Sequence, residues 1–181
     1  PQRALIEFML QTNANDADRT MKQARKRAIQ LYGMLANDYP NSPKLDEVLY
    51  YLAYEHEQAN DLRSARATYY DLIKKAPTSR YIPNAYLAFG ELFWNEAQGD
   101  PSKWDLAAQA YAEVIKYPAP QNKVQGYALY KTAYVYWNKG EFDRALDYFK
   151  KTVDFGVANP SLPGATKLAD SARRDLIPVY A

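Results

Sequence analysis

The chain has 181 residues and a formal net charge of +2, and 48% of its residues are hydrophobic. This composition supplies a continuous core, and the small charge excludes an electrostatic nucleic-acid footprint. The absence of Cys excludes disulfides, thiol catalysis and cysteine metal sites. No apolar run approaches the roughly 20 residues that span a bilayer, so we expect no transmembrane segment.

The first residue is Pro1 rather than Met, and no signal peptide is present. We therefore expect a fragment of a longer protein, with room upstream for an export signal or a lipid anchor. A chain without Cys fits a periplasmic and a cytoplasmic location equally.

Helical periodicity and turn residues predict nine helices along the chain. Apolar residues around 5–9 mark the first helix, and a polar turn at 12–18 separates it from the second. A longer turn is expected at 98–102, and Asn138-Lys139-Gly140 forms a tight one. The predicted helices are 3–13, 17–38, 44–59, 62–75, 82–97, 103–116, 122–138, 142–154 and 164–178.

One pattern recurs in the second helix of each of the first four helical pairs. It is Ala, an aromatic residue four positions on, an aliphatic residue three further, and usually Pro at the helix end. Offsets of three and four put these side chains on one helix face. The last copy has Thr as its third member and lacks the Pro. The copies are Ala28, Tyr32, Leu35, Pro40; Ala65, Tyr69, Leu72, Pro77; Ala107, Tyr111, Val114, Pro118; and Ala145, Phe149, Thr152.

Small residues mark the first helices of the last three pairs, at Ala53, Gly90 and Ala133. A small side chain lets a neighbouring helix approach closely. We expect these positions to face the Ala of the recurring pattern across each pair.

The recurring helical pair resembles the tetratricopeptide (TPR) repeat over nearly the whole chain. The resemblance implies an all-α, right-handed superhelical solenoid of about four helical hairpins with a C-terminal capping helix. It implies one domain, 1–181, with repeats at about 3–43, 44–80, 82–120 and 122–158 and the cap at 164–178. Solenoids of this class bind other proteins, so we expect a scaffold for a protein or peptide partner and no enzyme.

In TPR proteins the first helices line a concave groove, and the resemblance places a set of side chains there. The most distinctive part of this set is four aromatic residues on the first helix of the fourth hairpin. Such an aromatic stripe can anchor a partner segment. The alternative is that some of these rings pack on a neighbouring repeat or on the C-terminal helix. If they form the groove, Tyr130→Ala with Trp137→Ala should abolish binding without unfolding. The implied groove residues are Tyr50, Tyr54, Leu87, Glu91, Trp94, Tyr127, Tyr130, Tyr134 and Trp137.

Catalytic and cofactor signals are weak in this sequence. His56 is the single histidine, and it stands where the repeat places an aromatic residue, which favours a packed side chain over a ligand or a base. The Gly residues are scattered, so no phosphate loop is expected, and no cofactor or metal is predicted. The Lys, Asn and Arg clamp of chaperone-adaptor TPR proteins is absent.

A basic cluster lies on the predicted helix 17–38, where Lys22, Arg25 and Lys26 share a face. The simplest interpretation is a solvated face. The alternatives are contact with anionic lipid, a polyanionic glycan or an acidic partner.

A narrower resemblance rests on the segment Asp38-Tyr39-Pro40-Asn41-Ser42-Pro43 and on the opening of a later hairpin at 79–86. These segments resemble the BamD-like and CpoB-like periplasmic and lipoprotein TPR proteins of Gram-negative bacteria. The resemblance implies a periplasmic, outer-membrane-anchored scaffold in outer-membrane assembly, cell-wall coordination, motility or secretion. The rival function is a peptidoglycan- or glycan-binding module that uses the Tyr- and Trp-rich groove.

Overall fold

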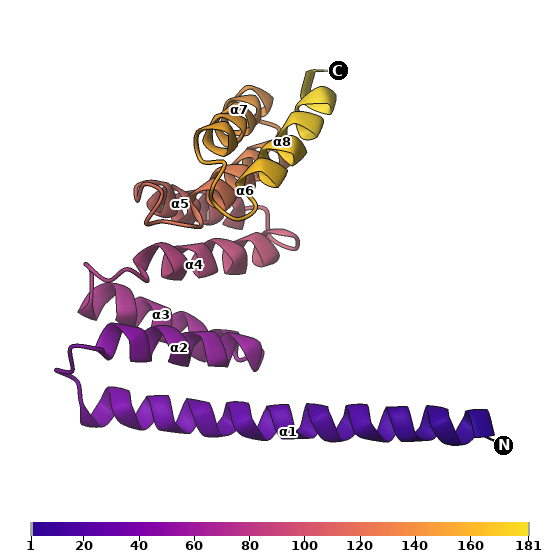
Figure 1. Ribbon diagram of the computed structural model, residues 1–181. Coiled ribbons are helices and arrows are strands. Elements are labelled where there is room, and N and C mark those ends of the chain that lie inside the picture. Colours follow the sequence, from indigo (N-terminus) through magenta and orange to yellow (C-terminus); the bar gives the residue numbers. More distant parts are fainter. Residues whose placement is uncertain (1, 181) are drawn as a thin grey trace. The chain divides into compact units, whose positions relative to one another are not determined.

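The computed structural model describes the backbone of residues 2–180 and the side chains of residues 16–176. Regular structure in this part of the chain is entirely helical (Figure 1), which confirms the predicted all-α class. None of the described helices has the length and apolar character that a membrane crossing requires. The helices are α1 (Gln2–Asp38), α2 (Leu45–Gln58), α3 (Leu62–Lys75), α4 (Ile82–Ala97), α5 (Lys103–Ile115), α6 (Gln125–Asn138), α7 (Phe142–Ala158) and α8 (Ala165–Tyr180).

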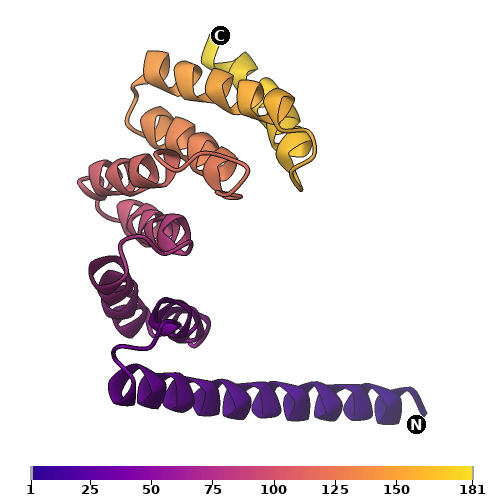
Figure 2. The same ribbon diagram turned by 60° about the vertical axis from the view of Figure 1, so that its left-hand side comes forward.

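The helices group into two compact units, Pro1–Ala76 and Pro77–Ala181. In the first unit α2 packs on α1 and α3. In the second unit each helix from α4 to α8 packs on the next, and α6 also touches α4 and α8 (Figure 2). The antiparallel pairs α2–α3, α4–α5 and α6–α7 are three helical hairpins, and α8 follows the last of them.

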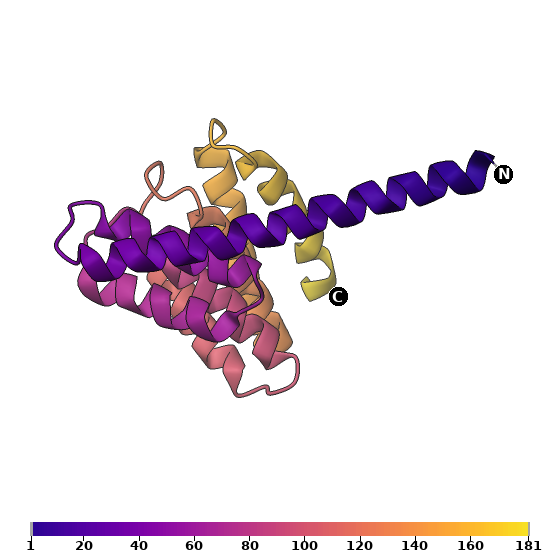
Figure 3. The same cartoon turned by 90° about the horizontal axis from the view of Figure 1, so that it is seen from below.

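The first predicted hairpin does not form, because α1 is one continuous helix. The prediction of separate helices at 3–13 and 17–38 is wrong. The polar segment between them contains neither Gly nor Pro, and the helix continues through it, with the Thr20 hydroxyl donating to the Asp16 carbonyl at 2.8 Å. The N-terminal part of α1 extends beyond α2 and α3 (Figure 3). The side chains of Leu5, Ile6, Phe8 and Met9 lie outside the described residues.

The remaining helix boundaries agree with the sequence prediction to within a few residues. Asn60, between α2 and α3, and Gly140, between α6 and α7, have φ of 60° and 74°, a backbone region that Asn and Gly tolerate best. The longer turn after α4 is present, and there the Asp100 carboxylate accepts a bond from the Ser102 backbone N–H. Helix α7 runs to Ala158 rather than 154, since the next Pro is Pro160.

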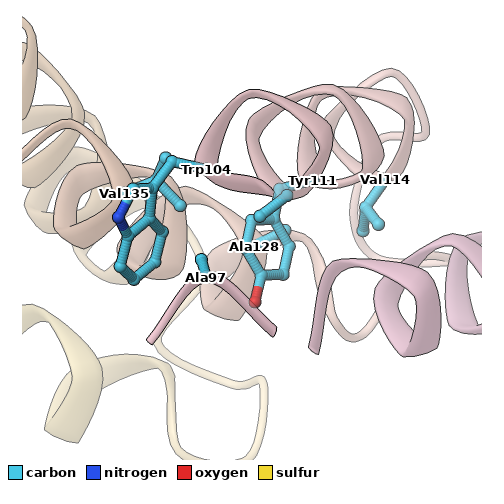
Figure 4. Close-up of a cluster of buried hydrophobic side chains, with 7 residues drawn as sticks. Ala97, Trp104, Tyr111, Val114, Ala128 and Val135 are labelled. Carbon is cyan, nitrogen blue, oxygen red and sulfur yellow. The ribbon is translucent and has the colours of Figure 1, made fainter. Parts of the chain in front are cut away.

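The recurring pattern forms the core of each hairpin. In α3, α5 and α7 all nine of its residues are at most 3% exposed. Figure 4 shows part of this core in the second unit, where Tyr111 and Val114 of α5 lie near Ala128 of α6. The partner positions Ala53 and Ala133 are fully buried as well.

Gly90 of α4 allows the closest approach in the α4–α5 hairpin. A Cβ at this position would overlap the ring of Tyr111, whose side chain is fully buried and therefore cannot move aside. The small residue thus makes room for the aromatic ring of the pattern. The expectation that Gly90 faces Ala107 needs this correction, because the ring one turn further along α5 occupies the space.

We predict that Gly90→Ala lowers the free energy of unfolding by about 1–3 kcal/mol, because the added methyl overpacks the contact with Tyr111. Gly33→Ala is the matched control, since Gly33 is also inside a helix and a Cβ added there would meet no atom within 4 Å. It should stabilise the chain by up to about 1 kcal/mol. Urea titrations followed by circular dichroism measure both changes, and an equal effect of the two substitutions would contradict the packing role of Gly90.

Candidate functional site

The predicted groove residues lie on α2 in the first unit and on α4 and α6 in the second. We call the side of α4 and α6 that carries Leu87, Glu91, Trp94 and Tyr127 the first-helix face. Its contacts run among α4, α5 and α6, all within one unit. The residues on α2 are described separately.

On α2, Tyr54 is the predicted residue that stays most open, with 43% of its surface exposed. Tyr50 is half-buried, and its ring lies 5.4 Å from that of Tyr51 and 6.4 Å from that of Tyr69. The Tyr69 hydroxyl donates a 3.0 Å hydrogen bond to Glu57 on α2. The Glu57 carboxylate of α2 therefore provides the hydrogen-bond acceptor for the hydroxyl of the buried Tyr69 of α3.

Glu91 has the same role on α4 and is shared with a third helix. One carboxylate oxygen accepts a 2.7 Å hydrogen bond from the Tyr111 hydroxyl of α5, and the other lies 3.3 Å from Lys131 Nζ of α6. The Lys131 side chain is only 13% exposed. Burial lowers the pKa of its ammonium, and the nearby Glu91 carboxylate opposes this shift.

Lys131 also covers one of the tryptophans. Its Nζ lies 3.6 Å from the centre of the Trp94 ring, a cation–π geometry, and 6.0 Å from that of Tyr127. The Trp94 ring packs edge-on against Trp104 at 4.9 Å. Tyr127 stays 40% exposed, and burial followed by the Glu91 charge raises the pKa of its hydroxyl. The cluster holds an open aromatic ring beside a positioned ion pair.

The other three aromatic residues of the predicted stripe on α6 face the interior of the second unit. The rings of Tyr130, Tyr134 and Trp137 lie 5.9, 5.3 and 6.3 Å from the fully buried ring of Phe149. Trp137 also meets Phe142 of α7 edge-on at 6.2 Å. The expectation that Tyr130→Ala with Trp137→Ala leaves the fold intact conflicts with these contacts.

The two tyrosines are tied to α8 by one carboxylate. Tyr130 and Tyr134 donate hydrogen bonds of 2.6 and 2.9 Å to the same oxygen of Asp175. Burial is the main cause that raises the pKa of both hydroxyls, and hydrogen bonding to Asp175 adds to it. Of the four-ring stripe, Tyr127 is thus the exposed member, and the C-terminal helix covers part of the rest.

The predicted basic patch lines an open cleft between α1 and the end of α2. Lys22, Arg25 and Lys26 surround a volume of about 690 Å³, with Ile29 among the lining residues. Two of the cations have acidic neighbours, since Lys22 pairs with Asp18 at 2.7 Å and Arg25 with Glu55 at 3.4 Å. The cleft is therefore less positive than the sequence suggests.

His56 lies at the end of α2, partly buried, with Nδ1 3.5 Å from the Asp61 carboxylate that caps α3. This is the setting of a packed side chain. Within residues 16–176 no group of three acidic or histidine side chains is placed to hold a metal ion.

Several residues of these networks do not belong to the groove that the sequence predicts, among them Lys131, Asp175 and Tyr111. Lys131 and Asp175 are ordinary surface-type charges in the sequence, and Tyr111 is a member of the core pattern. A signal exists for Lys131, which lies one turn after Tyr127 on the same helix face. Nothing in the sequence links Asp175 to Tyr130, because the two are 45 positions apart.

Comparisons with known proteins agree with this architecture. Residues 47–79 and 127–154 match the family model described as tetratricopeptide repeat. These two matches fall on the α2–α3 and α6–α7 hairpins. No curated protein matches the chain.

Two solved structures described as MamA share the fold. One has 23% sequence identity and a TM-score of 0.53, covering 88% of this chain and 82% of its own. The other has 23% identity and a TM-score of 0.56, covering 90% of this chain and 91% of its own. The structural similarity extends beyond the two segments that the family model matches. It shows a shared fold and does not identify a functional site.

We predict that the bond between Tyr130 and Asp175 stabilises the packing of α8. Tyr130→Phe and Asp175→Asn should each lower the free energy of unfolding by about 1 kcal/mol, since each removes or weakens a hydrogen bond to a charged group at a partly exposed site. The double substitution should cost clearly less than the sum of the two. Strict additivity in thermal and urea unfolding would show that the two side chains do not interact in solution.

Proposed function

We propose that this chain is a protein-interaction scaffold that binds a segment of a partner protein along the first-helix face. TPR repeats support a binding role in general. The observation that carries the specific site is Tyr127, a residue that remains 40% exposed although its neighbours are held by hydrogen bonds and ring contacts. A rigid aromatic residue beside buried polar groups is a typical anchor for a partner, because little side-chain entropy is lost on binding.

The cluster around Tyr127 defines the chemistry of the bound segment. Tyr127 offers an apolar ring with a polar tip, and half-buried Leu87 adds an aliphatic surface on α4. Lys131 and Glu91 already neutralise each other at 3.3 Å, so the site does not select a strongly charged ligand. A segment with apolar anchor residues and neutral polar groups fits this surface best.

The contacts of the tryptophans count against the rival function, stacking on the sugar rings of peptidoglycan. Lys131 lies over Trp94 at 3.6 Å, and Trp104 packs against the same residue. Trp137 has Phe142 and Phe149 as neighbours. Both indoles are thus already engaged in contacts within the chain, so titration with muropeptides should leave tryptophan fluorescence unchanged if the protein-binding proposal is right.

The cellular setting we propose is the Gram-negative cell envelope, with the scaffold serving an assembly, cell-wall, motility or secretion complex. The support is the Tyr39-Pro40-Asn41-Ser42-Pro43 segment and its resemblance to envelope TPR proteins. Protease treatment of intact and permeabilised cells tests this location for the native full-length protein. Protection that persists after the outer membrane is opened would contradict it.

We predict that Tyr127→Ala removes partner binding while the chain remains folded. Tyr70→Ala is the matched control, because Tyr70 is 59% exposed on the second helix α3. Cross-linked pull-downs of the native full-length protein, read by mass spectrometry, should lose the same partners with Tyr127→Ala and retain them with Tyr70→Ala. The free energy of unfolding of both variants should lie within about 1 kcal/mol of that of the unmodified chain. Equal recovery from the two variants would place binding elsewhere.

A further inference from the structure

One copy of the recurring pattern, on α1, has no preceding helix packed on it in the described chain, although α2 contacts another side of α1. In α3 and α5 the third pattern residue, Leu72 or Val114, is fully buried beneath the preceding helix of its hairpin. In α1 the equivalent Leu35 is 42% exposed. Because α1 is continuous, its own N-terminal part points along the helix axis and does not fold back over this position (Figure 3).

Leu35 belongs to a longer apolar stripe on α1. Apolar side chains recur there at spacings of three and four residues, which is the pattern of a helix-packing seam. Met21 is 61% exposed and Leu31 is 44% exposed, values far above those of pattern residues inside hairpins. We call this set the α1 stripe; it consists of Ala17, Met21, Ala24, Ala28, Leu31 and Leu35.

The two hairpins with a tyrosine in the pattern show what a covering helix supplies. Glu57 accepts the Tyr69 hydroxyl bond at 3.0 Å, and Glu91 accepts that of Tyr111 at 2.7 Å. The equivalent residue in α1 is Tyr32, whose ring stacks on Tyr51 at 6.1 Å. Among the described residues the Tyr32 hydroxyl has no hydrogen-bond partner. A helix seated on the α1 stripe would therefore complete the pattern by bringing a carboxylate.

The charge at the edge of the α1 stripe also favours a partner helix with acidic residues. Arg27 is exposed beside the stripe and makes no ion pair within residues 16–176. A second copy of the same stripe would bring further cations to this edge. Its nearby acid, Asp18, is already paired with Lys22 at 2.7 Å. A helix of different sequence with acidic residues beside its apolar face is the better complement.

We propose that the α1 stripe binds an amphipathic helix of a partner protein, which packs its apolar face on Leu31 and Leu35 and presents a carboxylate to the Tyr32 hydroxyl. The bound helix takes the place of the first helix in a hairpin, as α2 does for α3. This surface is separate from the first-helix face and gives the scaffold a second binding site.

The structure provides a probe for this site. A synthetic peptide with the sequence of residues 45–58 copies α2, the helix that covers the same pattern in α3 and contains Glu57. Fluorescence anisotropy of the labelled peptide with the full chain should show saturable binding. Tyr32→Phe should weaken that binding about ten- to a hundredfold, the effect of one lost hydrogen bond to a carboxylate. Leu35→Glu should abolish it.

The control is a peptide with Glu57→Gln, which should bind the unmodified chain as weakly as the original peptide binds the Tyr32→Phe chain. Combining both changes should cause no further loss. Absence of saturable binding, or binding indifferent to Tyr32→Phe, overturns the proposal. So does concentration-dependent self-association that Leu35→Glu removes, since the occupant would then be a second copy. Circular dichroism melts verify that each variant is folded.

Discussion

Each hairpin of this chain depends on how the aromatic residue of its second helix is buried. In the α4–α5 hairpin the Tyr111 ring fills the space that Gly90 leaves, and its hydroxyl enters the interior with it. A buried hydroxyl needs a partner, because leaving it unsatisfied costs about 1–3 kcal/mol. Glu91 provides that partner and in turn draws Lys131 toward it. A core requirement thus determines the polar groups of the first-helix face.

The hairpins solve this requirement in different ways, and the difference shapes the surface. Where the aromatic residue is tyrosine, an acid on the first helix accepts its hydroxyl bond. In the last hairpin the aromatic residue is Phe149, which has no hydroxyl. The rings of Tyr130 and Tyr134 pack edge-on against Phe149. Their own hydroxyls then reach Asp175 of α8. The face is therefore closed near α8 and open around Tyr127, so core packing determines which part of the face is exposed.

Much of the fold could be predicted from the sequence because its turns are chemically explicit. Pro and Gly mark the ends of α3 to α6, and the Ala-aromatic-aliphatic pattern identifies the buried side of each second helix. The failure at α1 has the opposite cause. Its polar segment is made of Asn, Asp, Ala and Thr, which weaken a helix by a few tenths of a kcal/mol per residue and do not break it. Polarity alone is therefore not a turn signal there.

The exposure of the candidate site residues was not predictable from the sequence. The resemblance to TPR repeats implied one stripe for Tyr127, Tyr130, Tyr134 and Trp137, and all four lie on α6. Which of them remains open depends on partners such as Asp175 and Phe149, which belong to other helices. Periodicity reports the direction of a side chain along its own helix. It carries no information about a neighbour that the fold brings in from a distant part of the chain.

The coupling energy between Tyr111 and Glu91 tests the central claim that core burial organises the first-helix face. It is obtained from a double-mutant cycle of Tyr111→Phe and Glu91→Gln in urea unfolding. We predict a coupling of about 1–3 kcal/mol, and a loss of the contact between Lys131 and Trp94 in the Glu91→Gln chain, seen as a change in tryptophan fluorescence. A coupling near zero with unchanged fluorescence would contradict the claim.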